Sequence, residues 1–241
     1  MERKVLGLIG ARGGSKGIPM KNLTNLGGKS LILWTIEAGL GSKSLDRLVV
    51  STDNLEIAQL SSNSGADVPF IRSSELATDK CLQIYVILDA LEKLESLGEV
   101  YTHVVLLQPT SPFRISEDID RAWDLYVSSN AKTLVSVQSV NFIQPSNLYR
   151  SKSRIRSSSL IELQSLDPDS MTSPGTSRQD FSEMWWRNGA IYIFQSSLLR
   201  ETQHLYHSPL VGFEMPWYRS INIDTVEDLR HAEIIARYLH N

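Results

Sequence analysis

The sequence has little that would suit it to an oxidising compartment or to a membrane. Its 241 residues include one cysteine, Cys81, which excludes an intramolecular disulfide and a cysteine-based zinc site. No stretch approaches the roughly 18 uninterrupted apolar residues that a membrane-spanning helix needs. The first residues also lack the apolar segment of a signal peptide. We therefore expect a cytoplasmic protein with no membrane partner.

An excess of charge and internal repeats are missing as well. The chain has 24 Lys and Arg against 27 Asp and Glu, a net charge of −3, which argues against a uniform basic surface for nucleic acid. No repeat has the period of a solenoid. With 41% hydrophobic and 21% charged residues, the chain can form one sizeable globular domain and a smaller appendage. Any phosphate that it binds should be held by a local cluster of donors.

Short apolar segments alternate with amphipathic segments of helical period. Strands are expected at 4–10, 45–51, 68–71, 102–107, 133–140, 189–194, 211–215 and 219–223. Helices are expected at 30–40, 54–64, 84–97, 116–127 with Ser116 as N-cap, and 225–239. Such alternation predicts a parallel sheet covered on both faces. The fold class is therefore α/β, a Rossmann-like three-layer sandwich with a mostly parallel sheet.

Residues 141–179 interrupt this alternation. They are rich in Ser, Pro and basic residues, and only 158–163 reads as a strand. The composition is compatible with a solvated surface loop and equally with an inserted arm or lid. We predict one α/β domain from 1–140 and 180–241, with 141–179 as an insertion.

A cationic, glycine-rich loop, Gly10 to Asn22, follows the first strand. Its glycines let backbone N–H groups converge on an anion, and Arg12, Lys16 and Lys21 add positive charge. The spacing is neither that of the P-loop nor that of the dinucleotide fingerprint. Such a turn can be a plain surface loop, but its charge would suit a triphosphate.

The string from Ala11 to Pro19, with Lys21-Asn22 after it, resembles the signature loop of the acylneuraminate (CMP-sialic acid) cytidylyltransferases. Further motifs agree in order and spacing: 50–53, 72–79, 107–112, 178–180, 188–192 and 223–225. The resemblance spans nearly the whole chain. It implies a nucleotidyltransferase that joins CMP from CTP to a nonulosonic acid of sialic-acid type, with release of pyrophosphate. Legionaminic acid is among the candidate acceptors.

The resemblance also implies roles for individual residues around the nucleotide. Lys21 matches the lysine proposed to stabilise charge on the α-phosphoryl group, and Arg12 and Arg178 match further catalytic positions. Phosphoryl-type transfer requires alignment and fixed positive charge, which such residues supply. Arg72 could equally be a solvated loop arginine, and Cys81 stands where many relatives carry serine. The implied nucleotide-binding residues are Arg12, Gly13, Gly14, Ser15, Lys16, Asn22, Arg72 and Cys81.

The sugar-acid side is matched by residues farther along the chain. Gln108 should lie at the carboxyl edge of the sheet, where open α/β sheets bind ligands. The guanidinium of Arg178 suits a sugar carboxylate or a phosphate. Thr110 and Ser111 could instead form a turn, and Asn188-Gly189 is also a common turn. The implied sugar-acid-binding residues are Gln108, Thr110, Ser111, Arg178 and Asn188.

The implied Mg²⁺ site departs from the family pattern. Relatives often carry two acidic residues where this chain has Asn222 and Asp224. Asp224 with the neutral oxygen of Asn222 and the substrate phosphates could still hold Mg²⁺, with weaker affinity. Asp224 could also simply cap the helix that opens at Thr225. Trp185-Trp186-Arg187 replaces the more usual Tyr-Arg-Pro, which leaves the identity of the nonulosonate open.

Two other functions remain open at this point. A Kdo cytidylyltransferase has a related reaction, but Gly13 to Gly17 favours the sialate type. A catalytically silent nucleotide-binding module is kept open by Asn222. The resemblance further implies that 141–179 is a dimerisation arm, so we expect a homodimer whose substrates are CTP and a nonulosonic acid.

Overall fold

The computed structural model describes residues 3–140, 148–154, 161–166 and 183–240. The chain divides into two compact units, Met1–Val137 with Arg187–Asn241, and Gln138–Trp186. The insertion expected at 141–179 falls within the second range. The two units are described separately below.

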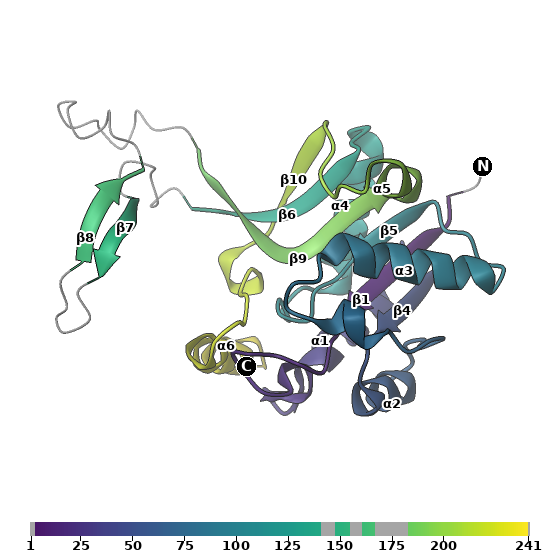
Figure 1. The fold of residues 1–241 in the computed structure, drawn as a ribbon, viewed down its shortest axis with the longest axis horizontal. Helices are drawn as coiled ribbons and strands as arrows, with labels where there is room; N and C mark the ends of the chain where they lie inside the picture. Colours follow the sequence, from purple (N-terminus) through teal and green to yellow (C-terminus); the bar gives the residue numbers. More distant parts are fainter. Residues whose placement is uncertain (1–2, 141–147, 155–160, 167–182, 241) are drawn as a thin grey trace. The chain divides into compact units, whose positions relative to one another are not determined.

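The first unit is built on a six-stranded sheet in the order β10-β6-β9-β5-β1-β4 (Figure 1). Strand β1 pairs in parallel with both β4 and β5, and β6 pairs in parallel with β10. Strand β9 runs antiparallel to β5. The predicted α/β fold with a mostly parallel sheet is thereby confirmed. The strands are β1 (Val5–Gly10), β4 (Arg47–Ser51), β5 (His103–Leu106), β6 (Thr133–Ser139), β9 (Trp185–Gln195) and β10 (Leu210–Glu214).

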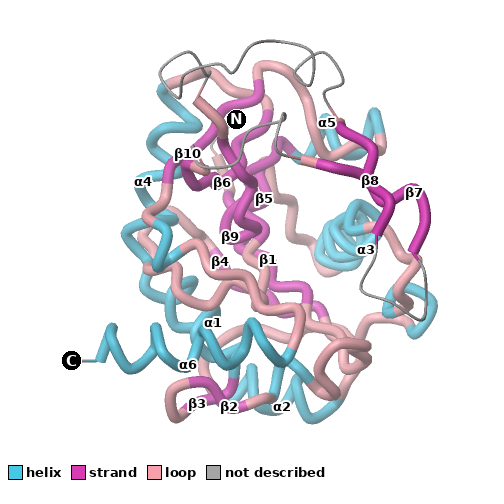
Figure 2. Tube along the Cα trace, turned by 90° about the vertical axis from the view of Figure 1, so that its left-hand side faces the viewer, coloured by secondary structure: helices cyan, strands magenta, loops and turns pink. Residues whose placement is uncertain are grey.

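Helices cover both faces of this sheet, which gives the three layers expected from the sequence. On one face Ile36 of α1, Ile57 of α2 and Ile119 of α4 share a buried cluster, and on the other Ile87 of α3 packs with Leu199 of α5. Figure 2 shows α1 and α4 on one side of the strands and α3 and α5 on the other. The helices are α1 (Leu31–Gly41), α2 (Leu55–Asn63), α3 (Gln83–Ser96), α4 (Ser116–Ser128) and α5 (Ser196–Thr202).

A third buried cluster ties the C-terminal helix α6 (Val226–His240) to the loop after β1. Ile18 of that loop and Ile223 pack together with Ala232 and Ala236 of α6. The short hairpin of β2 (Asn25–Leu26) and β3 (Lys29–Ser30) adds Leu26. The glycine-rich loop and the segment before α6 are therefore held against one another by apolar packing.

Several local predictions were wrong. Residues 219–223 form no strand, because the 3₁₀ helix η6 (Trp217–Arg219) occupies the start of that segment. The strand expected at 68–71 is reduced to bridges at Asp67 and Ile71. Helix α4 is capped at Ile115 rather than Ser116, since the Asp118 carboxylate accepts the Ile115 N–H at 3.1 Å. Helix α5 was not anticipated.

The second unit contains an antiparallel hairpin of β7 (Tyr149–Arg154) and β8 (Ile161–Ser165). The sequence predicted a strand only at 158–163, so β7 was missed. Residues 158–160 lie outside the described part of the chain. Across the part that is described, no helix combines the length and the apolar character needed to cross a bilayer.

Candidate active site

The glycine-rich loop crosses the carboxyl end of β1 and is held there by its own backbone. The Ala11 N–H donates to the Ser51 carbonyl at 3.0 Å, and the Gly13 N–H donates to Asp53 Oδ1 at 2.9 Å. Asn22, which is buried, donates from Nδ2 to the Arg12 carbonyl at 2.8 Å. The loop is thus fixed to the end of β4 and closed on itself by hydrogen bonds within the chain.

A cavity of about 360 Å³ lies at this end of the strands. It is bordered by the loop after β1 and by the loop after β5, two strands that are neighbours in the sheet. This is the edge where open α/β sheets bind their ligands. The lining residues are Gly10, Arg12, Gly14, Ser15, Lys21, Asn22, Gln83, Gln108, Pro109, Thr110, Asn222 and Asp224.

Lys21 is held at one wall of the cavity by the segment before α6. Its Nζ donates to the Ile223 carbonyl at 2.8 Å and to Asp224 Oδ1 at 2.9 Å, and its side chain is only 12% exposed. The Asp224 side chain is 63% exposed, and its Oδ2 accepts from Asn222 Nδ2 at 2.5 Å. Asp224, a predicted metal ligand, therefore contacts both the predicted catalytic residue Lys21 and the other predicted metal ligand, Asn222.

Asp224 does not cap the helix that follows it. The Thr225 hydroxyl accepts the Asp228 N–H at 3.2 Å, while the Asp228 carboxylate accepts the Thr225 N–H at 2.8 Å. This reciprocal pair satisfies the first turn of α6. The alternative reading of Asp224 as an N-cap is therefore wrong, and its carboxylate faces the cavity.

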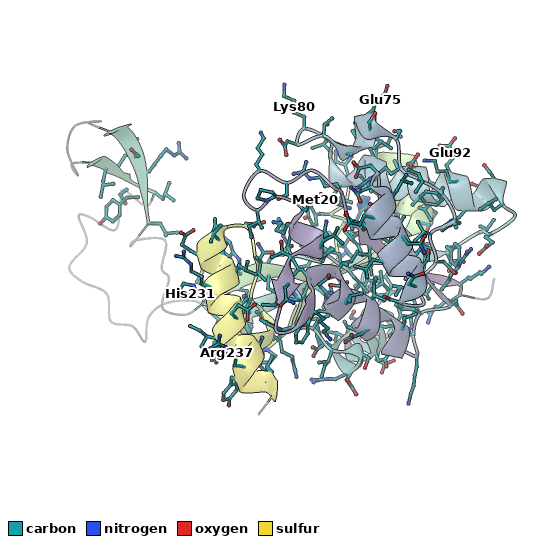
Figure 3. The ribbon with its side chains drawn as sticks, turned by 90° about the horizontal axis from the view of Figure 1, so that it is seen from below. Met20, Glu75, Lys80, Glu92, His231 and Arg237 are labelled. Atoms are coloured by element: carbon teal, nitrogen blue, oxygen red, sulfur yellow. The ribbon has the colours of Figure 1, made fainter. Side chains whose placement is uncertain are left out.

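Asp79 forms ion pairs with two of the loop cations. Its carboxylate lies 2.7 Å from Arg12 Nη2 and 2.7 Å from Lys16 Nζ. Hydrogen bonds from Lys16 and then Arg12 hold the pKa of the Asp79 carboxyl below its usual value. The segment of Asp79, marked in Figure 3 by Glu75 and Lys80, borders the loop through these pairs. Sequence reasoning missed this contact.

The loop after β5 presents Gln108 and Thr110 to the cavity because Arg114 pins it from behind. Arg114 is buried, and it donates from Nε to the Ala190 carbonyl at 2.8 Å and from Nη1 to Thr35 Oγ1 at 2.7 Å. Its Nη2 donates to the Gln108 carbonyl. Arg114 is thus a positioning residue that the sequence did not reveal.

Ser111 and Asn188 do not line the cavity in this structure. The Ser111 hydroxyl donates to the Asn188 carbonyl at 2.9 Å. The Asn188 side chain is buried: its Oδ1 accepts from the Ser136 hydroxyl at 2.6 Å, and its Nδ2 donates to the Ser220 hydroxyl at 2.8 Å. Both residues brace the wall behind Gln108. A Cβ added at Gly189 would lie only 2.9 Å from Oε1 of Gln108.

The other predicted residues fall in three places. Arg72 and Cys81 line a second cavity of about 250 Å³, where burial lowers the pKa of Arg72. Trp185 and Trp186 open β9, both exposed. Arg178 lies outside the described residues.

Fold and site together define a nucleotide-binding α/β protein whose cationic loop meets a carboxylate and a polar second loop in one cavity. The family model described as "Cytidylyltransferase" matches residues 6–159. The chain belongs to the cytidylyltransferase family.

Named relatives agree with this family. The chain is 29% identical over 237 residues to the pseudaminic acid cytidylyltransferase of Campylobacter jejuni, with 98% of each chain covered. It is 42% identical over 143 residues to the CMP-N,N'-diacetyllegionaminic acid synthase of Legionella pneumophila, which covers 59% of this chain and 61% of the relative. It is 33% identical to the N-acylneuraminate cytidylyltransferase of Escherichia coli over 98% of this chain but 53% of the relative. The chain therefore spans about half the length of the last.

Solved structures share the fold at low identity. A CMP:2-keto-3-deoxy-manno-octonic acid synthetase complexed with CTP superposes with a TM-score of 0.69 at 16% identity, over 98% of this chain and 99% of that one. A 4-diphosphocytidyl-2C-methyl-D-erythritol synthase superposes with a TM-score of 0.62 at 13% identity, over 98% and 99%.

Proposed function

We propose that this chain transfers the cytidylyl group of CTP to the anomeric hydroxyl of a nonulosonic acid and releases pyrophosphate. The single observation that carries the proposal is the 360 Å³ cavity shared by the cationic loop, the Gln108 loop and Asp224. The names of the relatives support the acceptor class, since they act on pseudaminic, legionaminic or N-acylneuraminic acid.

The chain's own residues account for the charge and the alignment. Arg12, Lys16 and the amides of Gly13 to Ser15 would hold the triphosphate, and Lys21 would meet the α-phosphoryl oxygens. As the acceptor oxygen bonds to the α-phosphorus, the bond to the bridging oxygen breaks, pyrophosphate leaves and the hydroxyl proton is released. Fixed cations lower the barrier by stabilising charge that develops on the phosphoryl oxygens. Gln108 and Thr110 would orient the acceptor.

The donor set at the cavity wall fits Mg²⁺. Asp224 offers an exposed carboxylate, and Asn222 beside it donates to that carboxylate from Nδ2, so a rotation of the Asn222 amide would bring its oxygen to the metal. Among the described residues no group of three or more His, Cys, Asp or Glu could hold a metal, so phosphate oxygens and water would complete the set. A bound Mg²⁺ would supply charge neutralisation at the transferring phosphoryl group.

Pyrophosphate release from CTP and Mg²⁺ tests the proposal directly. The acceptor panel contains N-acetylneuraminic, N,N'-diacetyllegionaminic and pseudaminic acids, with Kdo as the shorter-chain comparison. We expect turnover with at least one nonulosonic acid and a loss of about 10²–10³-fold in Lys21→Ala, which lacks the cation at the α-phosphate. Turnover with Kdo alone would mean that the acceptor is Kdo and not a nonulosonic acid. Calorimetric CTP binding without turnover across the panel would make the chain a silent nucleotide-binding module.

We also propose a cytosolic homodimer in which the second unit acts as the arm. Its hairpin exposes the apolar side chains of Tyr149 and Leu163, which a partner could cover. Light scattering coupled to gel filtration should report twice the chain mass at micromolar concentration. A monomer under those conditions would contradict the dimer.

A further inference from the structure

The single cysteine of the chain lies in the second cavity of the first unit. This cavity of about 250 Å³ shares Gly10, Arg12 and Gln83 with the first cavity. The Cys81 side chain is partly exposed, and its Sγ lies 3.6 Å from the Leu82 carbonyl oxygen, a weak contact for a thiol. The thiol is therefore accessible from the same space as the loop that we assign to CTP.

Arg72, on the wall of the same cavity, indicates that a ligand enters it. Arg72 is 5% exposed, and its Nε and Nη2 have no hydrogen-bond partner among the described residues. The Asp53 carboxylate lies 3.7 Å from Nη2, beyond hydrogen-bond distance. Buried guanidinium donors are rarely left unpaired in native proteins. An acceptor such as a nucleotide oxygen would satisfy them.

We propose that Cys81 is a modification site for small anionic disulfides, and that the adduct blocks entry of the nucleotide. The inference rests on the proposed function only for the identity of that nucleotide. An adduct on Sγ would fill the space in front of Arg72 and beside Arg12. Three cations, Arg12, Lys16 and Arg72, stand at or beside this cavity against two carboxylates, Asp53 and Asp79, so the local net charge is positive and favours an anionic reagent.

The reaction is a thiol–disulfide exchange. The Cys81 thiol gives up its proton to solvent, the sulfur attacks one sulfur of the reagent, and a mixed disulfide forms as the second half leaves as a thiolate. No net oxidation of any other group is needed, since the reagent is the oxidant. A reducing thiol reverses the exchange and restores the free cysteine.

The test uses the full chain and dithiobis(nitrobenzoate), a dianionic disulfide whose released thiolate is coloured. One thiolate should be released per folded chain. When the rate of each reagent with Cys81 is divided by its rate with a free model thiol, the ratio should be larger for dithiobis(nitrobenzoate) than for neutral dithiodipyridine. CTP at 100 times its Kd should slow the reaction about 100-fold, because only the unliganded fraction reacts. Modified protein should lose CTP binding and turnover, and dithiothreitol should restore both.

Cys81→Ser supplies the control, since it leaves no thiol in the chain. The ratio of treated to untreated activity should stay at one in this variant, whatever its own activity. A thiol that reacts only after denaturation, or a modified chain that still binds CTP, would overturn the proposal. Calorimetry on the unmodified chain separates the two hypotheses. CTP that binds but does not protect Cys81 overturns the thiol site, whereas absence of CTP binding overturns the proposed function.

Discussion

Gly17 is the point where the glycine-rich loop touches the backbone of Asp224. A Cβ added at Gly17 would overlap the Asp224 carbonyl oxygen and lie 3.3 Å from its carbonyl carbon. Both neighbours are backbone atoms, so neither can rotate away. Gly17→Ala must therefore push the loop and the segment before α6 apart, and the contact of Lys21 with Asp224 lies between them.

The size of the effect follows from this overlap. Forcing an extra methyl into a packed site costs about 1–3 kcal/mol. A cost of about 2 kcal/mol lowers the melting temperature of a chain of this size by about 4–8 °C. A displacement of about 1 Å in the groups that align the reaction lowers the rate by about 10²-fold. We expect Gly17→Ala to show both losses.

Thermal melting and pyrophosphate release measure the two effects. Gly14→Ala is the matched control for stability, because an added Cβ at Gly14 would meet no atom within 4 Å. Its melting temperature should equal that of the wild type. A Gly17→Ala protein that melts and turns over like the wild type would refute the described contact. An equal loss of stability in Gly14→Ala would assign the effect to loop flexibility instead of overlap.

Three other predictions concern charge. Asp79→Asn should lower the Kd for CTP in calorimetry, since it removes the negative charge that is paired with both Arg12 and Lys16. Asn222→Asp should tighten Mg²⁺ binding by about tenfold in a metal titration of turnover, because a second carboxylate beside Asp224 adds roughly 1–2 kcal/mol of attraction near a protein surface. Burial, aided by Arg3, lowers the pKa of His103 to about 4. In the unfolded chain the pKa of this histidine is near 6.5. Between about pH 4 and 6.5 the unfolded chain therefore binds more protons than the folded chain, so the free energy of unfolding rises with pH. The rise across that window is about 1–2 kcal/mol after allowance for partial exposure.

Each of these has its own contrary result. A weaker CTP affinity in Asp79→Asn would mean that Asp79 organises the loop for binding and does not compete with phosphate. An unchanged Mg²⁺ requirement in Asn222→Asp would remove residue 222 from the metal site. The urea midpoint of the wild type should rise from pH 4.5 to 7, and that of His103→Gln should not. A rise that persists in His103→Gln would come from another titrating group.

The layered fold could be predicted from the sequence because periodicity is set locally by burial on one face or on both. The direction of β9 could not, since a buried apolar run has the same pattern in a parallel and an antiparallel strand. The alternation at 219–223 was misread for a related reason. Ile221 and Ile223 are apolar because they pack beside α6, and no strand pairing is involved.

The candidate site also has parts that the sequence could predict and parts that it could not. The sequence could predict a cationic, glycine-rich loop from the consecutive residues Arg12 to Asn22, because a loop that follows a strand must cluster its own donors. Arg114 and Asp79 gave no such signal. The role of Arg114 depends on backbone carbonyls that the fold brings from elsewhere, and that of Asp79 depends on meeting cations some sixty residues away in the chain. Asn188, which was predicted to bind the sugar acid, is buried and braces the wall behind Gln108.

The cations of the loop are paired with carboxylates of the chain itself. Arg12 and Lys16 share Asp79, and Lys21 contacts Asp224. In the proposed function, triphosphate binding would be an exchange of anions, in which phosphate oxygens replace carboxylate oxygens at the same donors. The gain in free energy is smaller than for bare cations, but the side chains are held in place beforehand and lose less entropy on binding. In the proposed reaction, a cation that draws Asp224 toward itself would release Lys21 for the α-phosphate, so metal binding and the position of Lys21 would be coupled through the Asp224 carboxylate.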